Sequence, residues 1–354
     1  MTAIDVAARL SRLNAVRKSV AVTDLILRSE LQGGQTRLRL FEPAHAAVDL
    51  IGWLQQNRPE VEAALLQYGG VVFRGFGGDG NGLFQGLVKA TIPDIQPYME
   101  GATPRTQLGE GVYTSTEFPH DQTIAQHNEL SYVMRWPMKI CFACRTAPAQ
   151  GGETPLTDVR RVLANLDPAI VQQFSERGWM LIRNYGNGLG PSWRKAFNTD
   201  DLDEVRRYCA QSDIALEIFD EEHIRTRQVR PAIRQHPVSA EHVWFNHIAF
   251  WHPSSLPEPV RQGLLAQFAH DALPYATCWG DGQQIDDGII AHINAAYRQA
   301  TLVTPWQQGD MVLLDNMLIA HGRNPFQGPR AIVVAMGQPY VPAQAAHPTW
   351  DRTK

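Results

Sequence analysis

The stretch Gln126-His127-Asn128-Glu129-Leu130-Ser131-Tyr132 decides how this chain is organised, together with one distant residue, His321. Of the 12 histidines, only His127 is followed two positions later by a carboxylate. Side chains at positions i and i+2 of a β-strand point to the same face, so we expect His127 and Glu129 to converge on one metal ion. His321 lies just beyond an apolar run at 311–314 and supplies a second imidazole. Two histidines and one carboxylate are the ligand set of non-haem Fe(II) oxygenases.

A His-x-Glu triplet has a plainer interpretation, because it also arises by chance at an exposed strand end as an incidental charge pair. The residues that follow Glu129 are Leu130, Ser131 and Tyr132, and this composition predicts a short strand. A rigid element is where an accurate site is best built, which favours the metal site. Glu129 as a general base is the other alternative, but the sequence offers it no obvious partner.

Composition excludes several classes of protein. The chain has 354 residues, 44% hydrophobic and 19% charged, which is enough for one extended domain or two ordinary ones. A net charge of -4 and a pI near 6.3 provide no basic surface for nucleic acid. No apolar run reaches the 18 residues that a membrane span needs, and the N-terminus has no apolar leader, so we expect a cytoplasmic protein. Residues 1–20 resemble a transit peptide weakly, but Val6, Leu10 and Leu13 predict a helix there.

The four cysteines do not suggest a disulfide framework. Cys141 and Cys144 have the C-x-x-C spacing of zinc and redox sites, but no second such pair is present. Residues 138–145 have the composition of a strand, in which positions three apart face opposite sides. We therefore expect two buried thiols rather than a metal pair.

Hydrophobic periodicity predicts an ordered series of elements. Helices are expected over 47–68, 84–90, 158–166, 168–177, 200–211, 257–270 and 287–299. Strands are expected over 71–73, 139–146, 153–157, 243–250, 302–306, 311–314 and 330–336. The polar segment 93–119 has no periodicity and is either a substrate lid or packed coil.

Strands on both sides of a helix-rich middle predict a mainly β domain with helical insertions, built on a double-stranded β-helix or jelly roll. Residues 1–40 are expected to pack on this core as an N-terminal extension. Residues 41–345 are expected to form a single domain with a helix-rich insertion around 158–300. A two-domain split is the alternative.

A candidate anion site accompanies the metal residues. Arg330 opens the strand after His321, and its planar guanidinium suits bidentate binding of a carboxylate. The alternatives are a surface ion pair for Arg330 and the same role for Arg323. Thr154, in Gly151-Gly152-Glu153-Thr154, supplies a hydroxyl that fits the same carboxylate, although a hairpin turn is the plainer interpretation of that motif.

Taken together, these motifs resemble the TauD/TfdA superfamily of Fe(II)/2-oxoglutarate-dependent oxygenases, and most closely its SyrP-like and clavaminate-synthase-like branch. That branch has Glu in place of the commoner Asp as the metal ligand. The resemblance runs from about Phe41 to about Gln338. It is carried by Phe73-Arg74-Gly75-Phe76, the segment 113–117, His127-Asn128-Glu129, Gly151-Gly152-Glu153-Thr154-Pro155, Gly280-Asp281-Gly282, the segment 315–323 and Arg330.

The resemblance implies a role for each matching residue. His127, Glu129 and His321 would hold Fe(II), and Arg330 and Thr154 would hold the C5 carboxylate of 2-oxoglutarate, with O2 as the second cosubstrate. The reaction would release succinate and CO2 and hydroxylate an unactivated C–H bond. Halogenating relatives lack the carboxylate ligand, so the presence of Glu129 favours hydroxylation, or a related desaturation, over halogenation.

The same resemblance implies an amino acid substrate in natural-product (antibiotic) biosynthesis, of aspartate or glutamate type and oxidised at Cβ. It would be held on a peptidyl carrier protein, or else be a free amino acid or another small carboxylic acid. Arg105 is a candidate partner for an acidic side chain, and Glu117 for a substrate ammonium group. Both have a plainer interpretation, as a solvated loop arginine and a residue that orders its loop.

Other histidines and aromatic residues are weaker candidates. His120, His247 and His252 are interpreted as ordinary histidines, although His247 also fits the mouth of an active site. Trp244, Phe250 and Trp251 are predicted core residues. Two other classes compete with an oxygenase. A non-catalytic metal-binding jelly roll would not require both Arg330 and Thr154, and a zinc hydrolase would want closer ligand spacing such as H-x-x-x-H.

Overall fold

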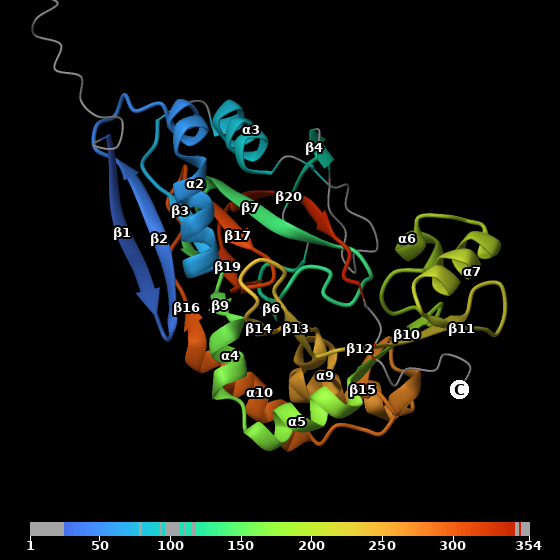
Figure 1. Cartoon of the computed structure of the whole chain (residues 1–354). Coiled ribbons are helices and arrows are strands. Elements are labelled where there is room, and N and C mark those ends of the chain that lie inside the picture. The colour runs from blue at the N-terminus through green and yellow to red at the C-terminus, as the bar shows by residue number, and fades with distance from the viewer. Residues whose placement is uncertain are drawn as a thin grey trace, which may run out of the picture.

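Two facing β-sheets organise the protein (Figure 1). The computed structural model describes residues 25–343 and 347, apart from 78–79, 93, 96–106, 110 and 115–117. The helix expected over 1–20 and the candidate residues Arg105 and Glu117 lie outside the described residues.

The large sheet has the order β1-β2-β3-β17-β7-β20-β5-β4. Adjacent strands in this sheet are antiparallel, except for β2 and β3, which are parallel. The strands are β1 (Ile26–Gly33), β2 (Thr36–Pro43), β3 (Gly70–Phe73), β17 (Met311–Asp315), β7 (Trp136–Thr146), β20 (Ala331–Tyr340), β5 (Val112–Thr114) and β4 (Gln107–Gly109). The middle of the sheet therefore combines strands from both ends of the chain.

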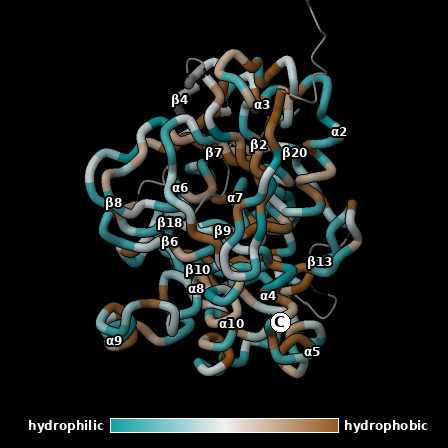
Figure 2. Tube along the Cα trace, turned by 90° about the vertical axis from the view of Figure 1, so that its left-hand side faces the viewer, coloured by the Kyte–Doolittle hydropathy of each residue, from teal (hydrophilic) through white to brown (hydrophobic). Residues whose placement is uncertain are grey.

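The small sheet has the order β16-β9-β18-β6. Its strands are β16 (Thr301–Leu302), β9 (Leu156–Asp158), β18 (Ile319–Arg323) and β6 (Ile124–His127). The inner face of the large sheet, with Phe142 and Val312, shares one hydrophobic core with Leu156 and Ile319 of the small sheet. Figure 2 shows hydrophobic residues gathered along strands of the large sheet such as β7. This two-layer arrangement is the predicted jelly roll.

The outer face of the large sheet forms a second core with α2 (Leu50–Tyr68) and α3 (Gly80–Thr91). Because strand residues alternate between faces, Cys141 lies in this outer core and Cys144 in the inner one. Burial raises the pKa of the Cys141 thiol, and that of Cys144 to about 11, so neither is a ready thiolate ligand. The prediction of two buried thiols is confirmed.

The middle of the chain adds helices and a separate sheet of order β11-β12-β10-β15. The helices are α4 (Val159–Asn165), α5 (Pro168–Arg177), α6 (Trp193–Phe197), α7 (Leu202–Gln211), α8 (Ile248–Trp251), η2 (Pro253–Ser255), α9 (Glu258–Gln267), η3 (His270–Ala272) and α10 (Asp287–Ala300). The strands are β10 (Trp179–Tyr185), β11 (Ala215–Ile218), β12 (Ile224–Arg230) and β15 (Tyr275–Trp279), with the pairs β13 (Ile233–Gln235) to β14 (His242–Trp244) and β8 (Gln150–Gly151) to β19 (Phe326–Gln327). The domain boundaries expected from the sequence stay a prediction.

Several predicted elements differ from the observed ones. The strand expected over 302–306 ends at Leu302, and Trp306 instead donates its Nε1–H to Thr154 Oγ1 at 3.1 Å. The strand expected over 243–250 is β14 followed by the helix α8. The strand expected over 153–157 begins only at Leu156. In each case the local sequence suggested a longer strand than the contacts with distant residues allow.

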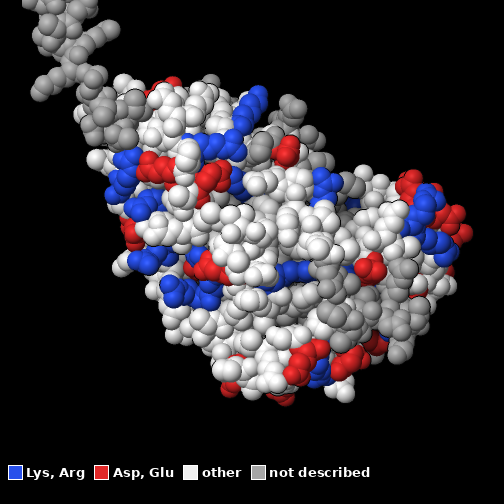
Figure 3. Space-filling model, viewed as in Figure 1, with Lys and Arg blue, Asp and Glu red and all other residues white. Residues whose placement is uncertain are grey.

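The helix α2 begins and ends at recognisable caps. Asp49 accepts a hydrogen bond from Ile51 N at its start, and Gly69 adopts a left-handed φ of 73° at its end. No helix in the described part of the chain is long and apolar enough to cross a membrane. On the face drawn in Figure 3, acidic and basic side chains are interspersed, so that face offers no uniform basic surface.

Candidate metal centre

Three buried or half-buried side chains meet between β6 and β18. His127 is the last residue of β6 and pairs directly with His321 of β18. One ligand atom from each of His127, Glu129 and His321 lies within 4.8 Å of the others. His321 Nε2 and Glu129 Oε2 are 3.8 Å apart. The structure therefore brings these three residues together, while their role as metal ligands stays a prediction.

The reason given for expecting them together was wrong in part, because β6 ends at His127 and residues 129–132 form a turn rather than a strand. Leu130 has a φ of 55°, the left-handed conformation that non-glycine residues rarely adopt. Its side chain is only 4% exposed, so burial in the core offsets the backbone strain. It is the reversal of the chain in this turn, and not the alternation of a strand, that directs Glu129 toward His127.

Asn316 holds this turn from the other side of the molecule. It lies in the connection between β17 and β18, where its Oδ1 accepts from Glu129 N at 2.7 Å. Its Nδ2 donates to Glu129 O and to Pro137 O, both at 2.8 Å. Asn128 Nδ2 completes the arrangement by donating to Asn316 O at 2.7 Å. Both asparagines are fully buried, so these bonds fix the backbone from which the Glu129 carboxylate projects.

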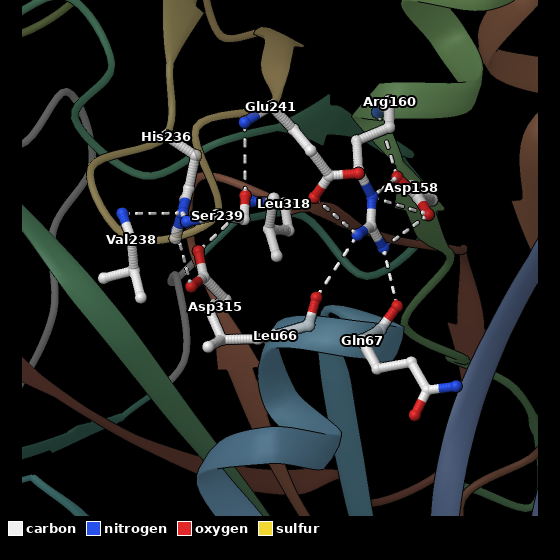
Figure 4. A network of polar contacts seen from close by, with 10 residues as sticks. All are labelled: Leu66, Gln67, Asp158, Arg160, His236, Val238, Ser239, Glu241, Asp315 and Leu318. Carbon is white, nitrogen blue, oxygen red and sulfur yellow. Dashed lines mark hydrogen bonds and ion pairs between the residues drawn. The ribbon is translucent and has the colours of Figure 1, made fainter.

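The turn that carries Asn316 is itself anchored (Figure 4). Asp315 Oδ1 accepts from Met317 N at 2.9 Å and Leu318 N at 3.2 Å, and its Oδ2 accepts from His236 Nε2 at 3.0 Å. His236 Nδ1 accepts from the backbone N–H groups of Val238 and Ser239, which leaves its proton on Nε2. His236 therefore orients the carboxylate that shapes the turn.

The same view shows a second anchor. Arg160 binds Asp158, Glu241 and the carbonyl oxygens of Leu66 and Gln67. It thereby ties the end of α2 to the start of α4, next to β18. The small sheet, through Asp158 of β9, is thus held by these polar contacts as well as by its packing in the core.

The donor set fits an iron(II) ion. The Nδ1 of His127 lies 2.9 Å from Ala125 O, and donating a proton there leaves Nε2 as the metal-binding nitrogen. Two imidazoles and one carboxylate, from a strand end, a turn and a strand, would hold the ion, and a three-residue ligand set of this kind keeps coordination positions open for small ligands.

A pocket joins the three residues to the predicted anion-binding residues. It is lined by Ile124, His127, Phe142, Thr154, His321, Gly322, Arg323, Arg330, Ile332 and Val334. The structure therefore brings Thr154 and Arg330 to the metal residues, as the sequence predicted, and places Arg323 in the same lining. Its walls are otherwise mostly apolar, which limits access of water.

Contacts distinguish the two arginines. Arg323 is bound to the backbone oxygens of Phe118, Pro119 and Gln122, with Phe118 O at 2.8 Å and Gln122 O at 2.7 Å. Its guanidinium therefore fastens the segment before β6. Arg330 donates from Nε to Gly152 O at 2.9 Å and lies over the Phe326 ring at 5.5 Å.

Arg330 is the better candidate for an anion. Burial, together with the charge of Arg323, lowers the pKa of Arg330 to about 10. A lowered pKa means that the surroundings disfavour the positive charge, which an anion in the pocket would favour.

Aromatic side chains surround the metal residues. His127 lies 4.8 Å from the Phe250 ring and 5.5 Å from that of His247, and His247 stacks on Trp251 at 4.5 Å. Trp244 is buried in the core as predicted, and the half-buried Trp251 packs against that core. Phe250 is also half-buried but packs against His127 rather than in the core, so its assignment to the core was wrong.

The three other histidines considered as candidates from the sequence differ in their surroundings. His247 is buried and accepts or donates a 2.6 Å bond to Ser131 Oγ beside the metal residues. His252 is a buried histidine bonded to Ser254, as expected of a core residue. His120 is exposed and packs on Phe326.

Comparisons with known proteins agree with this site. A family model described as "Taurine catabolism dioxygenase TauD, TfdA family" matches residues 35–336. The dapdiamide synthesis protein DdaC of Enterobacter agglomerans is 40% identical over 292 residues, which covers 82% of this chain and 89% of that protein. A clavaminate synthase-like protein of Arabidopsis thaliana is 29% identical over 293 residues, covering 80% and 86%.

Solved structures show the same fold. The PvcB protein of Pseudomonas aeruginosa superposes with a TM-score of 0.54 at 16% identity, covering 91% of this chain and 94% of that one. A second PvcB structure, described as an Fe, alpha-ketoglutarate dependent oxygenase from an isonitrile synthetic pathway, gives 0.52 at 16% identity and covers 88% and 91%.

The chain belongs to the TauD/TfdA family of Fe(II)/2-oxoglutarate-dependent oxygenases. It is an oxygenase that uses Fe(II), 2-oxoglutarate and O2, which confirms the class and cofactors predicted from the sequence.

Proposed function

We propose that His127, Glu129 and His321 hold Fe(II), and that Arg330 and Thr154 hold the C5 carboxylate of 2-oxoglutarate. The observation that carries this assignment is the meeting of three metal-binding side chains within 4.8 Å of one another, next to a pocket that Arg330 and Thr154 line. A guanidinium and a hydroxyl are the donors that a carboxylate requires. A non-catalytic metal-binding protein would not need them.

The side chains of this site position the reactants and exclude water. When bound, iron and 2-oxoglutarate supply the oxidising chemistry that converts O2 and 2-oxoglutarate to succinate and CO2 and oxidises a C–H bond. His127 is kept in one tautomer by Ala125 O, and Glu129 is kept in place by Asn316. Phe142, Ile332 and Val334 shield the pocket from solvent. Glu129 completes the ligand set, which favours return of a hydroxyl group over transfer of a halide.

We further propose that the substrate is an amino acid of aspartate or glutamate type, hydroxylated at Cβ while it is held on a peptidyl carrier protein in natural-product biosynthesis. The 40% identity to a dapdiamide synthesis protein supports a place in such a pathway. Arg105 and Glu117 stay predicted substrate contacts.

The test is succinate formation by the Fe(II)-loaded enzyme with 2-oxoglutarate and O2. Free amino acids are compared with the same amino acids loaded on a carrier protein, and the product is checked for one added oxygen atom. Stimulation by the loaded carrier alone is expected. Stimulation by free amino acids would move the substrate assignment to a small-molecule hydroxylase, and no stimulation by any amino acid in either form would contradict it.

The metal assignment has its own test. Glu129→Ala is expected to abolish succinate formation and weaken Fe(II) binding, because a carboxylate ligand is lost. His120→Ala is the matched control, since His120 is exposed and outside the three-residue cluster. Equal iron affinity in Glu129→Ala and His120→Ala would reject Glu129 as a ligand.

A further inference from the structure

A buried arginine lies outside the site described so far. Arg183 is in β10, on the face that also carries Trp179 and Leu181 of the main core, and only 6% of it is exposed. Its cross-strand neighbours are Thr226 of β12 and Tyr275 of β15. Its surroundings are therefore a buried sheet face and not solvent.

The Arg183 guanidinium hydrogen-bonds to the Tyr275 side chain, but its Nε and Nη2 have no hydrogen-bond partner among the residues that the structure describes. The guanidinium also lies over two rings, 5.0 Å from the centre of Tyr185 and 5.3 Å from that of Tyr275. Burial alone lowers the pKa of Arg183, but the phenols of Tyr185, Tyr275 and Tyr132 outweigh it, and the pKa stays above its ordinary value. The side chain is charged.

The neighbouring strand shows how this fold satisfies a buried arginine. Arg230, in β12 of the same sheet, is fully buried and donates to the backbone oxygens of Tyr132 and Ser212 and to Gln228 Oε1, at 2.7 to 3.1 Å. Arg183, in contrast, has the Tyr275 side chain and two aromatic faces, and two of its three guanidinium nitrogens stay without a partner among the described residues. Buried N–H donors that lack acceptors destabilise a fold, and cation–π contacts offset only part of that cost. A purely structural role would not favour such an arrangement.

A continuous layer of rings leads from Arg183 to the metal residues. Tyr275 stacks on Trp251 at 5.2 Å with an interplanar angle of 11°, and Trp251 stacks on His247 at 4.5 Å. His247 in turn lies 5.5 Å from His127. Tyr132, three residues beyond Glu129, contacts both His247 and Trp251, at 5.0 and 4.8 Å.

This layer is accessible at its centre. His127, Phe250, Trp251 and Tyr275 are all partly exposed, whereas the core residues behind them are buried. A small molecule that lies on these rings would reach the metal residues at one end and the guanidinium at the other. Arg183 does not line the pocket that Arg330 and Thr154 line, so the two arginines belong to different parts of the site.

We propose that Arg183 binds a carboxylate of the substrate and thereby sets which carbon faces the metal centre. This inference rests on the proposed function and narrows its substrate class to an amino acid with an anionic group at the far end of the aromatic layer. The planar guanidinium offers two parallel N–H donors to a carboxylate, and pairing would satisfy the donors that lack partners within the described residues.

Equilibrium binding tests this inference without relying on turnover. The enzyme loaded with Fe(II) and 2-oxoglutarate is titrated without O2 against L-aspartate, its two monoamides L-asparagine and L-isoasparagine, and the aspartyl thioester of N-acetylcysteamine. The last of these mimics a carrier-bound amino acid. The variants are Arg183→Met and, as the matched control, Arg234→Met, which removes another buried arginine that lies over a ring, that of Trp136 at 5.1 Å.

The carboxylate probes are those that keep the carboxylate bound by Arg183: L-aspartate and whichever other probes still carry that group. Arg183→Met is expected to bind them about 10- to 100-fold more weakly, because a charge-assisted pair is lost. Its affinity for the monoamide in which that carboxylate is an amide should be unchanged. Weak binding of L-asparagine by the wild type would identify the side-chain carboxylate as the partner, and weak binding of L-isoasparagine the α-carboxylate. Arg234→Met should keep the wild-type preferences, and affinity for 2-oxoglutarate should be the same in all three proteins.

Three results would overturn the inference. The first is that Arg183→Met binds the carboxylate probes as tightly as the wild type does. The second is that the wild type binds L-aspartate and both monoamides equally well, and the third is that it binds no carboxylate probe.

If Arg183→Met fails to fold, Arg183→Lys replaces it, with a smaller loss of affinity expected. The thermal midpoint without probe adds a structural readout. It should not fall in Arg183→Met if Arg183 serves the substrate, and a large fall would assign it to the fold. Arg183-dependent binding without hydroxylation would instead count against the proposed function alone.

Discussion

The Asn316 side chain hydrogen-bonds both polar groups of the Glu129 backbone: its Oδ1 accepts from Glu129 N at 2.7 Å, and its Nδ2 donates to Glu129 O at 2.8 Å. The two residues are 187 positions apart in the sequence. A metal ligand from the first half of the chain is thus positioned by an amide from the last part.

Replacing this amide should loosen the metal site. Asn316→Ala removes the bonds to Glu129 and leaves buried backbone groups without partners, so we expect about 10- to 100-fold weaker Fe(II) binding and a loss of stability of about 2 kcal/mol. Metal titration followed by calorimetry, and denaturant unfolding, measure the two effects. Asn294→Ala is the control, since the Asn294 side chain donates to Ser255 Oγ and does not belong to the cluster of His127, Glu129 and His321. Iron affinity equal in the two variants would contradict the role of Asn316.

The two arginines of the pocket should behave differently. Arg330→Met is expected to raise the Kd for 2-oxoglutarate about 10- to 100-fold, because a carboxylate loses its guanidinium partner. Arg323→Met should mainly lower the stability of the segment before β6, since Arg323 binds the backbone oxygens of residues 118, 119 and 122. Calorimetric titration with 2-oxoglutarate separates the cases. A larger effect from Arg323→Met would reverse the assignment.

A glycine beside Arg330 should not tolerate a side chain. Gly152 has a φ of 70°, and an added Cβ would lie 2.7 Å from Pro148 Cγ, 2.9 Å from Phe326 Cβ and 3.1 Å from Arg330 Cδ. Gly152→Ala should therefore strain the backbone and displace Arg330, with a several-fold rise in the KM for 2-oxoglutarate and little change in iron affinity. Gly263→Ala is the control, because an added Cβ there meets nothing within 4 Å. An unchanged KM in Gly152→Ala would show that the pocket adjusts.

Protonation of His252 should limit stability in acid. Burial lowers the pKa of His252 to about 4. Its Nδ1 accepts from Ser254 N at 3.2 Å and bonds to Ser254 Oγ at 2.8 Å, which favours the neutral ring. The unfolded chain, with a histidine pKa near 6.5, binds the proton more readily than the native state between about pH 6.5 and 4. The stability from this residue is therefore complete above about pH 6.5 and falls as pH decreases toward 4, by roughly 3 kcal/mol at most.

Denaturant unfolding between pH 7 and 4 measures this slope, and His252→Gln should flatten it. His120→Gln is the comparison, because His120 is exposed. Equal slopes in the wild type and His252→Gln would show that other groups set the acid sensitivity.

The sequence predicted the chemistry of the site better than its local structure. A His-x-Glu pair, a distant histidine and an arginine are recognisable because few residue types bind iron or a carboxylate. The turn at Leu130 was missed because Leu, Ser and Tyr in succession suggest a strand, while the turn is imposed by Asn316 from far away in the sequence. Tertiary contacts of this kind leave no local pattern.

The sheet of order β11-β12-β10-β15 was missed for a different reason. β12 reads Ile-Arg-Thr-Arg-Gln-Val-Arg, and its buried face carries polar side chains such as Thr226, Gln228 and Arg230. Alternation of apolar and polar residues fails as a signal when the buried face is itself polar. The neighbouring strand β10 of the same sheet carries Arg183.

The place of β17 in the large sheet has a consequence for how the protein is made. Residues 311–315 form the strand between β3 and β7, so the two halves of the sheet cannot join until most of the chain has been synthesised. Folding that depends on contacts so distant in sequence is slow, and unpaired strand edges stay exposed meanwhile. We therefore expect nascent chains that end before Met311 to need chaperones, and His321 to join the metal centre only in the last stage of folding.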